Sequence, residues 1–157
     1  MPFPMKRQAL DLWCWAAVSA ATEKYFNPLT AKTQCSIASD VKQTRCCPRK
    51  EVCNTVDSLE LALSKIGRLR APVVTGPIPF DQIRNEIRDG FPVAARIAWN
   101  GGGGHFVVIT GYRKYPSRQE VITIADPLGT GGRWLYDDFV HAYQLTGVWT
   151  HTYFLRP

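Results

Sequence analysis

Apolar residues in the first half of the chain follow a helical spacing. Residues 15–25 contain neither glycine nor proline, so a helix is predicted to begin near Cys14 and to run to about Phe26. Helices are predicted in this half over residues 14–26, 34–41, 56–66 and 81–88. Thr33 and Asp81 are predicted to cap the second and the fourth of these helices.

The second half of the chain changes to the alternating or continuous apolar pattern of strands. Strands are predicted over residues 92–99, 105–112, 121–125, 133–136 and 148–155. A brief helix capped by Asp137 is predicted before the last strand. Helices first and strands afterwards, without βαβ alternation, predict an α+β fold with an antiparallel sheet. Because no linker divides the chain, we expect a single domain over residues 1–157.

The composition is typical of a globular protein with a moderate positive charge. Hydrophobic residues make up 45%, charged residues 20%, and the net charge is +6. Scattered basic residues favour a solvated basic surface over a nucleic-acid site. No apolar run approaches the roughly 20 residues of a membrane span, so neither nucleic acid nor membrane is an expected partner. Residues 1–7 lack the apolar segment of a signal peptide, which leaves a cytosolic protein, another export route or a domain of a longer chain.

Four of the five cysteines, Cys35, Cys46, Cys47 and Cys53, form a cluster in a loop-like stretch. An even cluster predicts two disulfides, with free thiols as the alternative; the spacing does not fit a zinc knuckle, and no metal or other cofactor is expected. A vicinal Cys46–Cys47 bridge would strain the peptide between them. That leaves Cys35–Cys46 with Cys47–Cys53, or Cys35–Cys47 with Cys46–Cys53, of which we favour the second. Disulfides imply an extracytoplasmic location or passage through a secretion system.

The remaining cysteine, Cys14, is predicted in the first turn of a helix. Unpaired backbone N–H groups and the positive end of the helix dipole favour the thiolate there, and the thiolate is the nucleophilic form. Taken alone, a small buried core cysteine is the commoner explanation. Gln8, six positions earlier, has an amide that can donate to an oxyanion together with the Cys14 N–H. Its simpler explanation is a surface glutamine.

Two later residues supply the partners that a nucleophilic cysteine requires. His105 opens an apolar strand directly after four glycines, which allow close approach of another segment. Asp126 ends the next strand, where an antiparallel pairing can bring it beside His105, although an Asp-Pro pair also commonly begins a turn. A base within reach of Cys14 and a carboxylate that orients the base are the parts of a catalytic triad. His141 and His151 are predicted to be ordinary surface or half-buried residues.

Together these motifs resemble the papain-like cysteine proteases. The motifs are Gln8-x5-Cys14-Trp15, His105-x5-Gly111-Tyr112 and Asp126-Pro127-x-Gly129. The aspartate in place of papain's asparagine and the Trp-Cys-Trp-Ala-Ala run look more like the bacterial C39-like peptidases and especially the AvrRpt2-type effector proteases. The cysteine cluster also resembles the latter group. The resemblance implies a papain-like fold, with an N-terminal helical part packed on a C-terminal antiparallel sheet and the active site between them.

The resemblance also implies a function. Cys14 would be the nucleophile of a cysteine endopeptidase, His105 the general base and then acid, Asp126 the orienting residue and Gln8 an oxyanion donor, with Trp15 packed behind the nucleophile. The protein would be a monomeric bacterial toxin or effector, delivered by a secretion system into a target cell. Its expected partners are a protein substrate and a neutralising immunity protein. Two alternatives remain: a catalytically idle C39-like peptide-binding module, and a papain-like transglutaminase or deamidase. Idle copies typically lack the nucleophile, so the three retained triad residues favour an enzyme.

Overall fold

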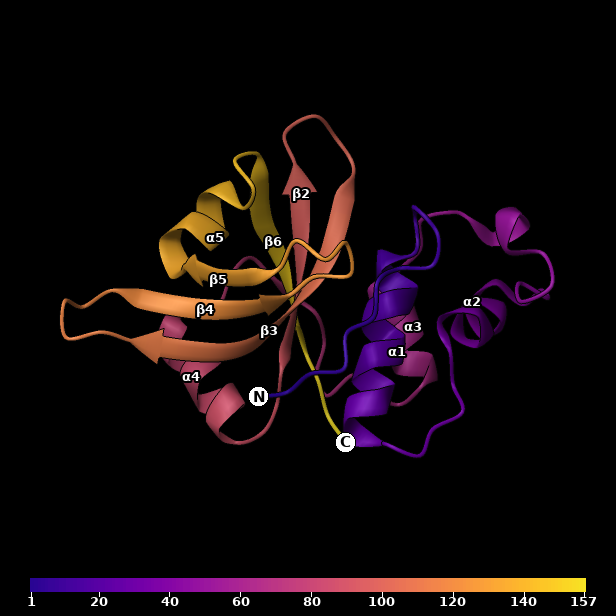
Figure 1. Cartoon of the computed structure of the whole chain (residues 1–157), viewed down its shortest axis with the longest axis horizontal. Coiled ribbons are helices and arrows are strands. Elements are labelled where there is room, and N and C mark those ends of the chain that lie inside the picture. Colours follow the sequence, from indigo (N-terminus) through magenta and orange to yellow (C-terminus); the bar gives the residue numbers. More distant parts are fainter.

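The computed structural model describes residues 1–157, apart from the side chain of Lys50, as helices packed against a six-stranded sheet (Figure 1). The helical elements are α1 Cys14–Phe26, α2 Gln34–Lys42, the 3-10 turn η1 Lys50–Cys53, α3 Leu59–Lys65, α4 Phe80–Arg88 and α5 Tyr136–Ala142. The strands are β1 Val74–Thr75, β2 Val93–Trp99, β3 Gly104–Lys114, β4 Glu120–Ala125, β5 Gly132–Leu135 and β6 Gly147–Phe154. Their order in the sheet is β1-β6-β2-β3-β4-β5, and every neighbouring pair is antiparallel. The predicted α+β arrangement with an antiparallel sheet is confirmed.

The helix caps differ from the sequence expectation at two sites. Thr33 caps α2 as predicted, because its side chain accepts from the Ser36 N–H in a capping box. Asp81, in contrast, lies inside the first turn of α4, with Pro79 in the cap position, and its carboxylate pairs with Arg84 at 3.1 Å. Asp137 likewise lies in the first turn of α5 and does not cap it. A carboxylate in a first turn still favours the helix through the dipole, which is why the sequence signal looked like a cap.

The cysteine cluster forms two disulfides with the favoured connectivity. Cys35 is bridged to Cys47 and Cys46 to Cys53, with Cα–Cα separations of 5.1 Å and 5.6 Å. The first bridge ties the loop to α2, and the second buries both of its cysteines in the core. Among the side chains that the structure describes, Cys14 is the one free cysteine. Two bridges of this kind are typical of proteins that fold in an oxidising compartment.

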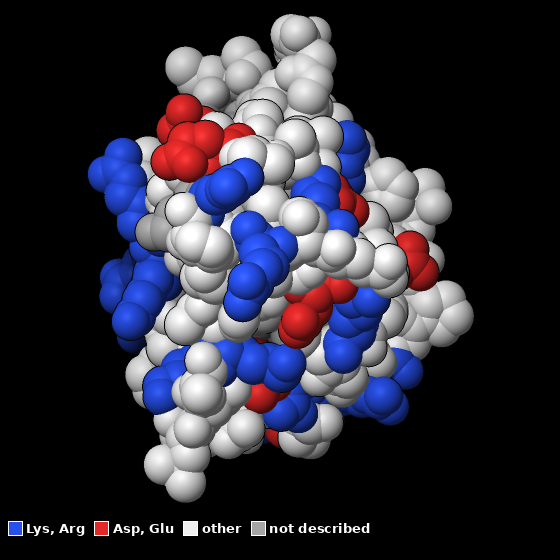
Figure 2. All heavy atoms as spheres, turned by 90° about the vertical axis from the view of Figure 1, so that its right-hand side faces the viewer, with Lys and Arg blue, Asp and Glu red and all other residues white. Residues whose placement is uncertain are grey.

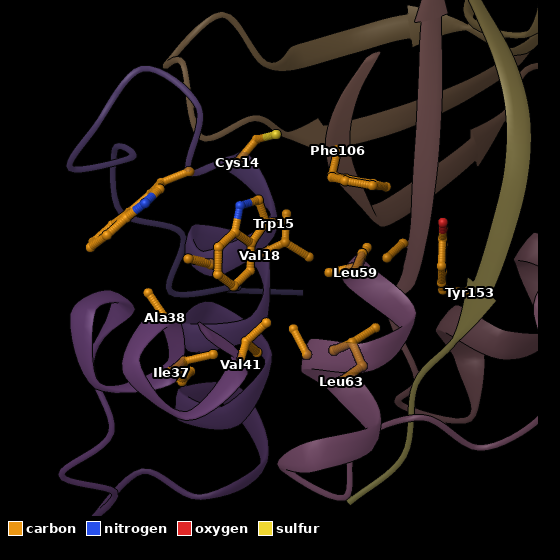
Figure 3. Close-up of a cluster of buried hydrophobic side chains, with 14 of the residues drawn as sticks. Cys14, Trp15, Val18, Ile37, Ala38, Val41, Leu59, Leu63, Phe106 and Tyr153 are labelled. Atoms are coloured by element: carbon orange, nitrogen blue, oxygen red, sulfur yellow. The ribbon is translucent and has the colours of Figure 1, made fainter. Parts of the chain in front are cut away.

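Two hydrophobic clusters lie on opposite faces of the sheet. Successive side chains of β3 belong alternately to the two clusters. Phe106 and Val108 face α1–α3, whereas Val107 and Ile109 lie on the face covered by α4 and α5. This is the two-residue period of a strand buried on both faces. The first cluster contains Trp15 and the other aromatic and aliphatic side chains between the helical part and the sheet (Figure 3). Burial on this face therefore fixes α1 against the strands.

Positive charge gathers on the helical part of the molecule. Residues 1–70 contain eleven Lys or Arg and six Asp or Glu, so most of the +6 net charge lies there. Figure 2 shows the face on this side of the molecule, where basic side chains outnumber acidic ones. No helix in residues 1–157 is both long and apolar enough to cross a membrane.

Candidate active site

Cys14 is the first residue of α1 and lies where the helical part meets the sheet. Cys14 is 8% exposed, and its sulfur points away from the helices toward the strand that carries Phe106 (Figure 3). The indole groups of Trp13 and Trp15 donate hydrogen bonds to the carbonyl oxygens of Cys53 at 2.7 Å and Thr55 at 3.1 Å. These bonds fix both neighbours of Cys14 to the segment that ends the second disulfide loop.

His105 and Asp126 are brought together by the pairing of β3 with β4. The Nε2 atom of His105 lies 2.8 Å from Oδ1 of Asp126, and both residues are almost fully buried. Because Nε2 is engaged by Asp126, Nδ1 is the ring nitrogen left for the sulfur of Cys14. The expected juxtaposition of strand start and strand end is therefore present.

The Asp126 carboxylate accepts hydrogen bonds from several groups besides His105. Oδ1 also accepts the Leu128 N–H at 2.7 Å, and Oδ2 accepts the Tyr143 hydroxyl at 2.6 Å. Weaker contacts to Oδ2 come from the Thr130 hydroxyl at 3.2 Å and the Gln144 amide at 3.4 Å. A buried carboxylate held by this many donors has one fixed orientation. It can therefore orient the imidazole of His105.

The pKa values of the pair favour the charged forms. Burial alone would lower the pKa of His105, but the hydrogen bond to Asp126 and the contact with Cys14 outweigh it and raise the pKa from 6.5 to about 9. Burial alone would raise the pKa of Asp126, yet the bond to His105 and the donated hydrogen bonds lower it. At neutral pH the pair is an imidazolium beside a carboxylate.

Two aromatic residues of the site were not identified from the sequence. The ring of Trp99 stacks on His105 with centroids 6.1 Å apart and on Tyr143 with centroids 6.3 Å apart. Trp99 ends β2, and Tyr143 follows α5. Together they cover the bond between His105 and Asp126 with apolar surface, which strengthens it by excluding water. No local spacing marks either residue, because they meet only in the folded sheet.

Gln8 lies near this site, but its amide is already engaged. Nε2 donates to the carbonyl oxygens of Leu10 at 3.0 Å and Asp11 at 2.6 Å, and the backbone N–H of Gln8 donates to the Pro127 carbonyl at 2.9 Å. The Gln8 side-chain oxygen is buried without a hydrogen-bond partner among the described residues. The backbone bond holds the segment before α1 against the turn that follows Asp126.

A cleft of about 290 Å³ opens beside Cys14. It is lined by Leu12, Cys14, Trp15, Val56, Asp57, Arg96, Gly103, Gly104 and Phe106. The backbone of Gly102 and Gly103 has φ values of +91° and +83°, which glycine adopts freely. These glycines let the loop before His105 turn back toward α1 without side chains that would fill the cleft.

The sequence profile of the Peptidase_C39 like family matches residues 2–155 of the chain. The protein belongs to the Peptidase_C39 like family. No curated protein matches the chain. Membership of this family supports a cysteine peptidase-like function, and the α+β fold is compatible with that of papain-like peptidases.

The other two histidines of this C39-like family member do not join the site. His141 is exposed on α5, and Nδ1 of His151 lies 3.0 Å from the hydroxyl of its neighbour Thr150. Among the described residues no group of three or more His, Cys, Asp or Glu side chains could hold a metal ion.

Proposed function

We propose that this protein is a cysteine endopeptidase in which Cys14, His105 and Asp126 form the catalytic triad. The observation that carries the proposal is the position of His105. Its ring bonds the buried carboxylate of Asp126 through Nε2, and its contact with Cys14 contributes to the raised pKa. A base fixed by a third group and within reach of a cysteine at a helix start is the arrangement of an activated nucleophile.

The reaction follows from these positions. The Cys14 thiolate attacks the peptide carbonyl carbon, and the carbonyl electrons move to oxygen. The backbone N–H of Cys14, in the first turn of α1 and without an intrahelical partner, donates to that oxyanion. Gln8 is the proposed second donor; it must release one of its two hydrogens from a backbone carbonyl to act.

His105 then serves as acid and as base. The imidazolium protonates the leaving amine as the C–N bond breaks, which leaves a thioester on Cys14. The neutral ring next removes a proton from the attacking water, and collapse of the second tetrahedral intermediate releases the acid and the thiolate. Asp126 stays ionised throughout and stabilises the imidazolium, as its lowered pKa favours.

We place the enzyme in the AvrRpt2-type branch and assign it a role as a secreted bacterial toxin or effector that acts in a target cell. Support comes from the two disulfides, which suit an extracytoplasmic protein, and from the cysteine cluster itself. We further propose that it acts as a monomer on a protein substrate and that an immunity protein neutralises it in the producing cell.

The experiment compares a cell lysate treated with wild-type protein and with the Cys14→Ala variant. Fragments present only with the wild type, identified by N-terminal sequencing, support the endopeptidase. Triad members act as a unit, so Cys14→Ala and His105→Ala should each lower activity by ~10³-fold or more, whereas His141→Ala is the matched control and should keep it. Intact mass spectrometry separates the alternatives: a one-dalton gain identifies a deamidase, and cross-linked products a transglutaminase. If neither the wild type nor any variant alters the lysate proteins, the remaining explanation is a catalytically idle peptide-binding module.

A further inference from the structure

Arg96 differs from the other half-buried arginines of the molecule. Arg68 pairs with Glu23 at 2.7 Å, and Arg84 pairs with Asp81 at 3.1 Å. Arg96 is also half buried, but it lies within 4.0 Å of no carboxylate among the side chains that the structure describes. A guanidinium removed from water without a carboxylate costs free energy, which a bound anion would recover.

The position of Arg96 is fixed by the sheet. Its Nη1 atom donates to the hydroxyl of Thr150 on the neighbouring strand β6 at 3.0 Å. The guanidinium group also lies flat against Gly104: a Cβ atom added there would stand 2.9 Å from Nη2. Glycine at this position therefore makes room for the guanidinium next to His105. The one hydrogen bond to Thr150 leaves most of the five N–H donors free for another acceptor.

The cleft around Arg96 suits a side chain with an apolar stem and an anionic end. Leu12, Val56 and Phe106 supply apolar walls, and Cys14 lies in the same cleft. The one acidic residue of the lining, Asp57, does not neutralise Arg96, because its carboxylate bonds the ammonium group of Lys42 at 2.6 Å.

We propose that Arg96 binds the carboxylate of an acidic side chain in the substrate, so that the enzyme cleaves peptide bonds near an Asp or Glu residue. This inference rests on the proposed endopeptidase function and names the substrate class for the same site. A planar guanidinium forms two parallel hydrogen bonds with a carboxylate and carries the opposite charge. A neutral amide in the substrate has no charge for the guanidinium to attract. A cleft of about 290 Å³ holds only one or two side chains. One extended residue spans about 3.4 Å, so the acidic residue lies within about three positions of the scissile bond.

The charge of the surrounding surface favours the same substrates. Lys and Arg side chains outnumber Asp and Glu on the face of the helical part (Figure 2). Leu12, Cys14 and Trp15 of the helical part line the cleft. Fields of this kind raise the local concentration of acidic peptides and fall with added salt. The surface brings such peptides near, and Arg96 selects the position of the carboxylate.

The first test measures, without any peptide, whether the cleft favours a negatively charged reagent over a neutral one. Cys14 is alkylated with iodoacetate, which carries a carboxylate, and with neutral iodoacetamide, and the ratio of the two rates is compared between variants. The ratio should fall by roughly 10-fold or more in Arg96→Gln, because a hydrogen bond to a charged group is lost. Arg113→Gln, which removes an exposed charge outside the cleft lining, is the matched control and should leave the ratio unchanged. An equal ratio in wild type and Arg96→Gln overturns the inference, whether or not peptides are cleaved.

The second test determines which residues flank the peptide bonds that the protein cleaves. A peptide library prepared from a whole proteome is digested, and the residues on each side of every new terminus are counted. Wild-type cleavage should be enriched for Asp or Glu at one position, Arg96→Gln should lose the enrichment, and Arg96→Glu should shift it to Lys or Arg. Cleavage without an acidic preference overturns the assignment of Arg96 and leaves the endopeptidase standing. A library left uncut by the wild type overturns the endopeptidase and this substrate class with it.

Discussion

The Asp126→Asn substitution separates the charge of the site from its shape. Asparagine keeps the size of the side chain and an oxygen for the Leu128 N–H, but it removes the negative charge beside His105. Burial on its own lowers the pKa of His105, and only the contact with Cys14 would remain to oppose burial, so loss of the carboxylate should lower that pKa from about 9. We therefore expect the titration midpoint of this one histidine to move to lower pH in Asp126→Asn.

The same change predicts how stability depends on pH. A rise in the pKa of His105 from 6.5 to about 9 corresponds to about 3 kcal/mol of unfolding free energy, at about 1.4 kcal/mol per pH unit. The folded-state pKa lies above the unfolded one, so this contribution is complete below pH 6.5 and is lost as the pH rises through about 9. At the acid end, the lowered pKa of Asp126 gives stability that is present above its ordinary value of 3.8 and is lost as the pH falls through the folded-state value.

Two measurements check these values. The imidazole resonances of His105, followed by NMR against pH, give its pKa in wild type and in Asp126→Asn. Urea unfolding at pH 6, 8 and 10 should show a free-energy difference between the two proteins that shrinks toward pH 10, by as much as about 3 kcal/mol. The Cys14→Ala variant is the control, and it should lower the pKa of His105 by less, because the bond to Asp126 contributes more than the contact with Cys14. A wild-type midpoint near 6.5, or the same midpoint in Asp126→Asn, would refute the ion pair.

Three further changes test the surroundings of the proposed triad. Tyr143→Phe removes the 2.6 Å hydrogen bond to Asp126 and should lower the unfolding free energy by about 1–3 kcal/mol in urea; an unchanged value would mean that water replaces the hydroxyl without cost. Gln8→Ala should reduce kcat on the order of 10²-fold if its amide serves the oxyanion, and an unaltered kcat would leave it a structural role at the start of α1. Replacing Cys46 and Cys53 by serine should cost about 2–4 kcal/mol of stability. Intact mass spectrometry should find the native protein four hydrogens lighter than its reduced form, and stoichiometric zinc or four free thiols would contradict both bridges.

The elements that the sequence predicts well are those with a long regular period. The helix of residues 14–26 has no glycine or proline after its first residue, and the strand that contains His105 is a long apolar run. Cys14 and His105 stand at the starts of these elements, where their positions follow directly from the pattern. The two-residue strand β1 escaped prediction because Val74 and Thr75 are exposed and take their conformation from pairing with β6. An edge strand this short has no period to detect.

The contacts around His105 and Asp126 were harder to predict than the positions of these two residues at the ends of their strands. Tyr143 and Trp99 are 44 positions apart and meet only because β2, β3 and β6 are neighbours in the sheet. The unpaired state of Arg96 is equally non-local, since it depends on which carboxylates the fold brings near. Sequence motifs identify groups that must be of one chemical type, whereas supporting contacts can be supplied by many residues from many positions.

The hydrogen bonds from Trp13 and Trp15 to Cys53 and Thr55 connect the segment around Cys14 to the end of the loop that the Cys46–Cys53 bridge closes. Thermodynamic linkage is reciprocal, so a free energy that the Cys46–Cys53 bridge gives to the start of α1 is returned in equal amount to the bridge. A ligand or alkylating reagent that stabilises the ordered helix start around Cys14 would thus make the bridge harder to reduce. The reduction potential of the Cys46–Cys53 disulfide should therefore become more negative when a ligand occupies the cleft beside Cys14.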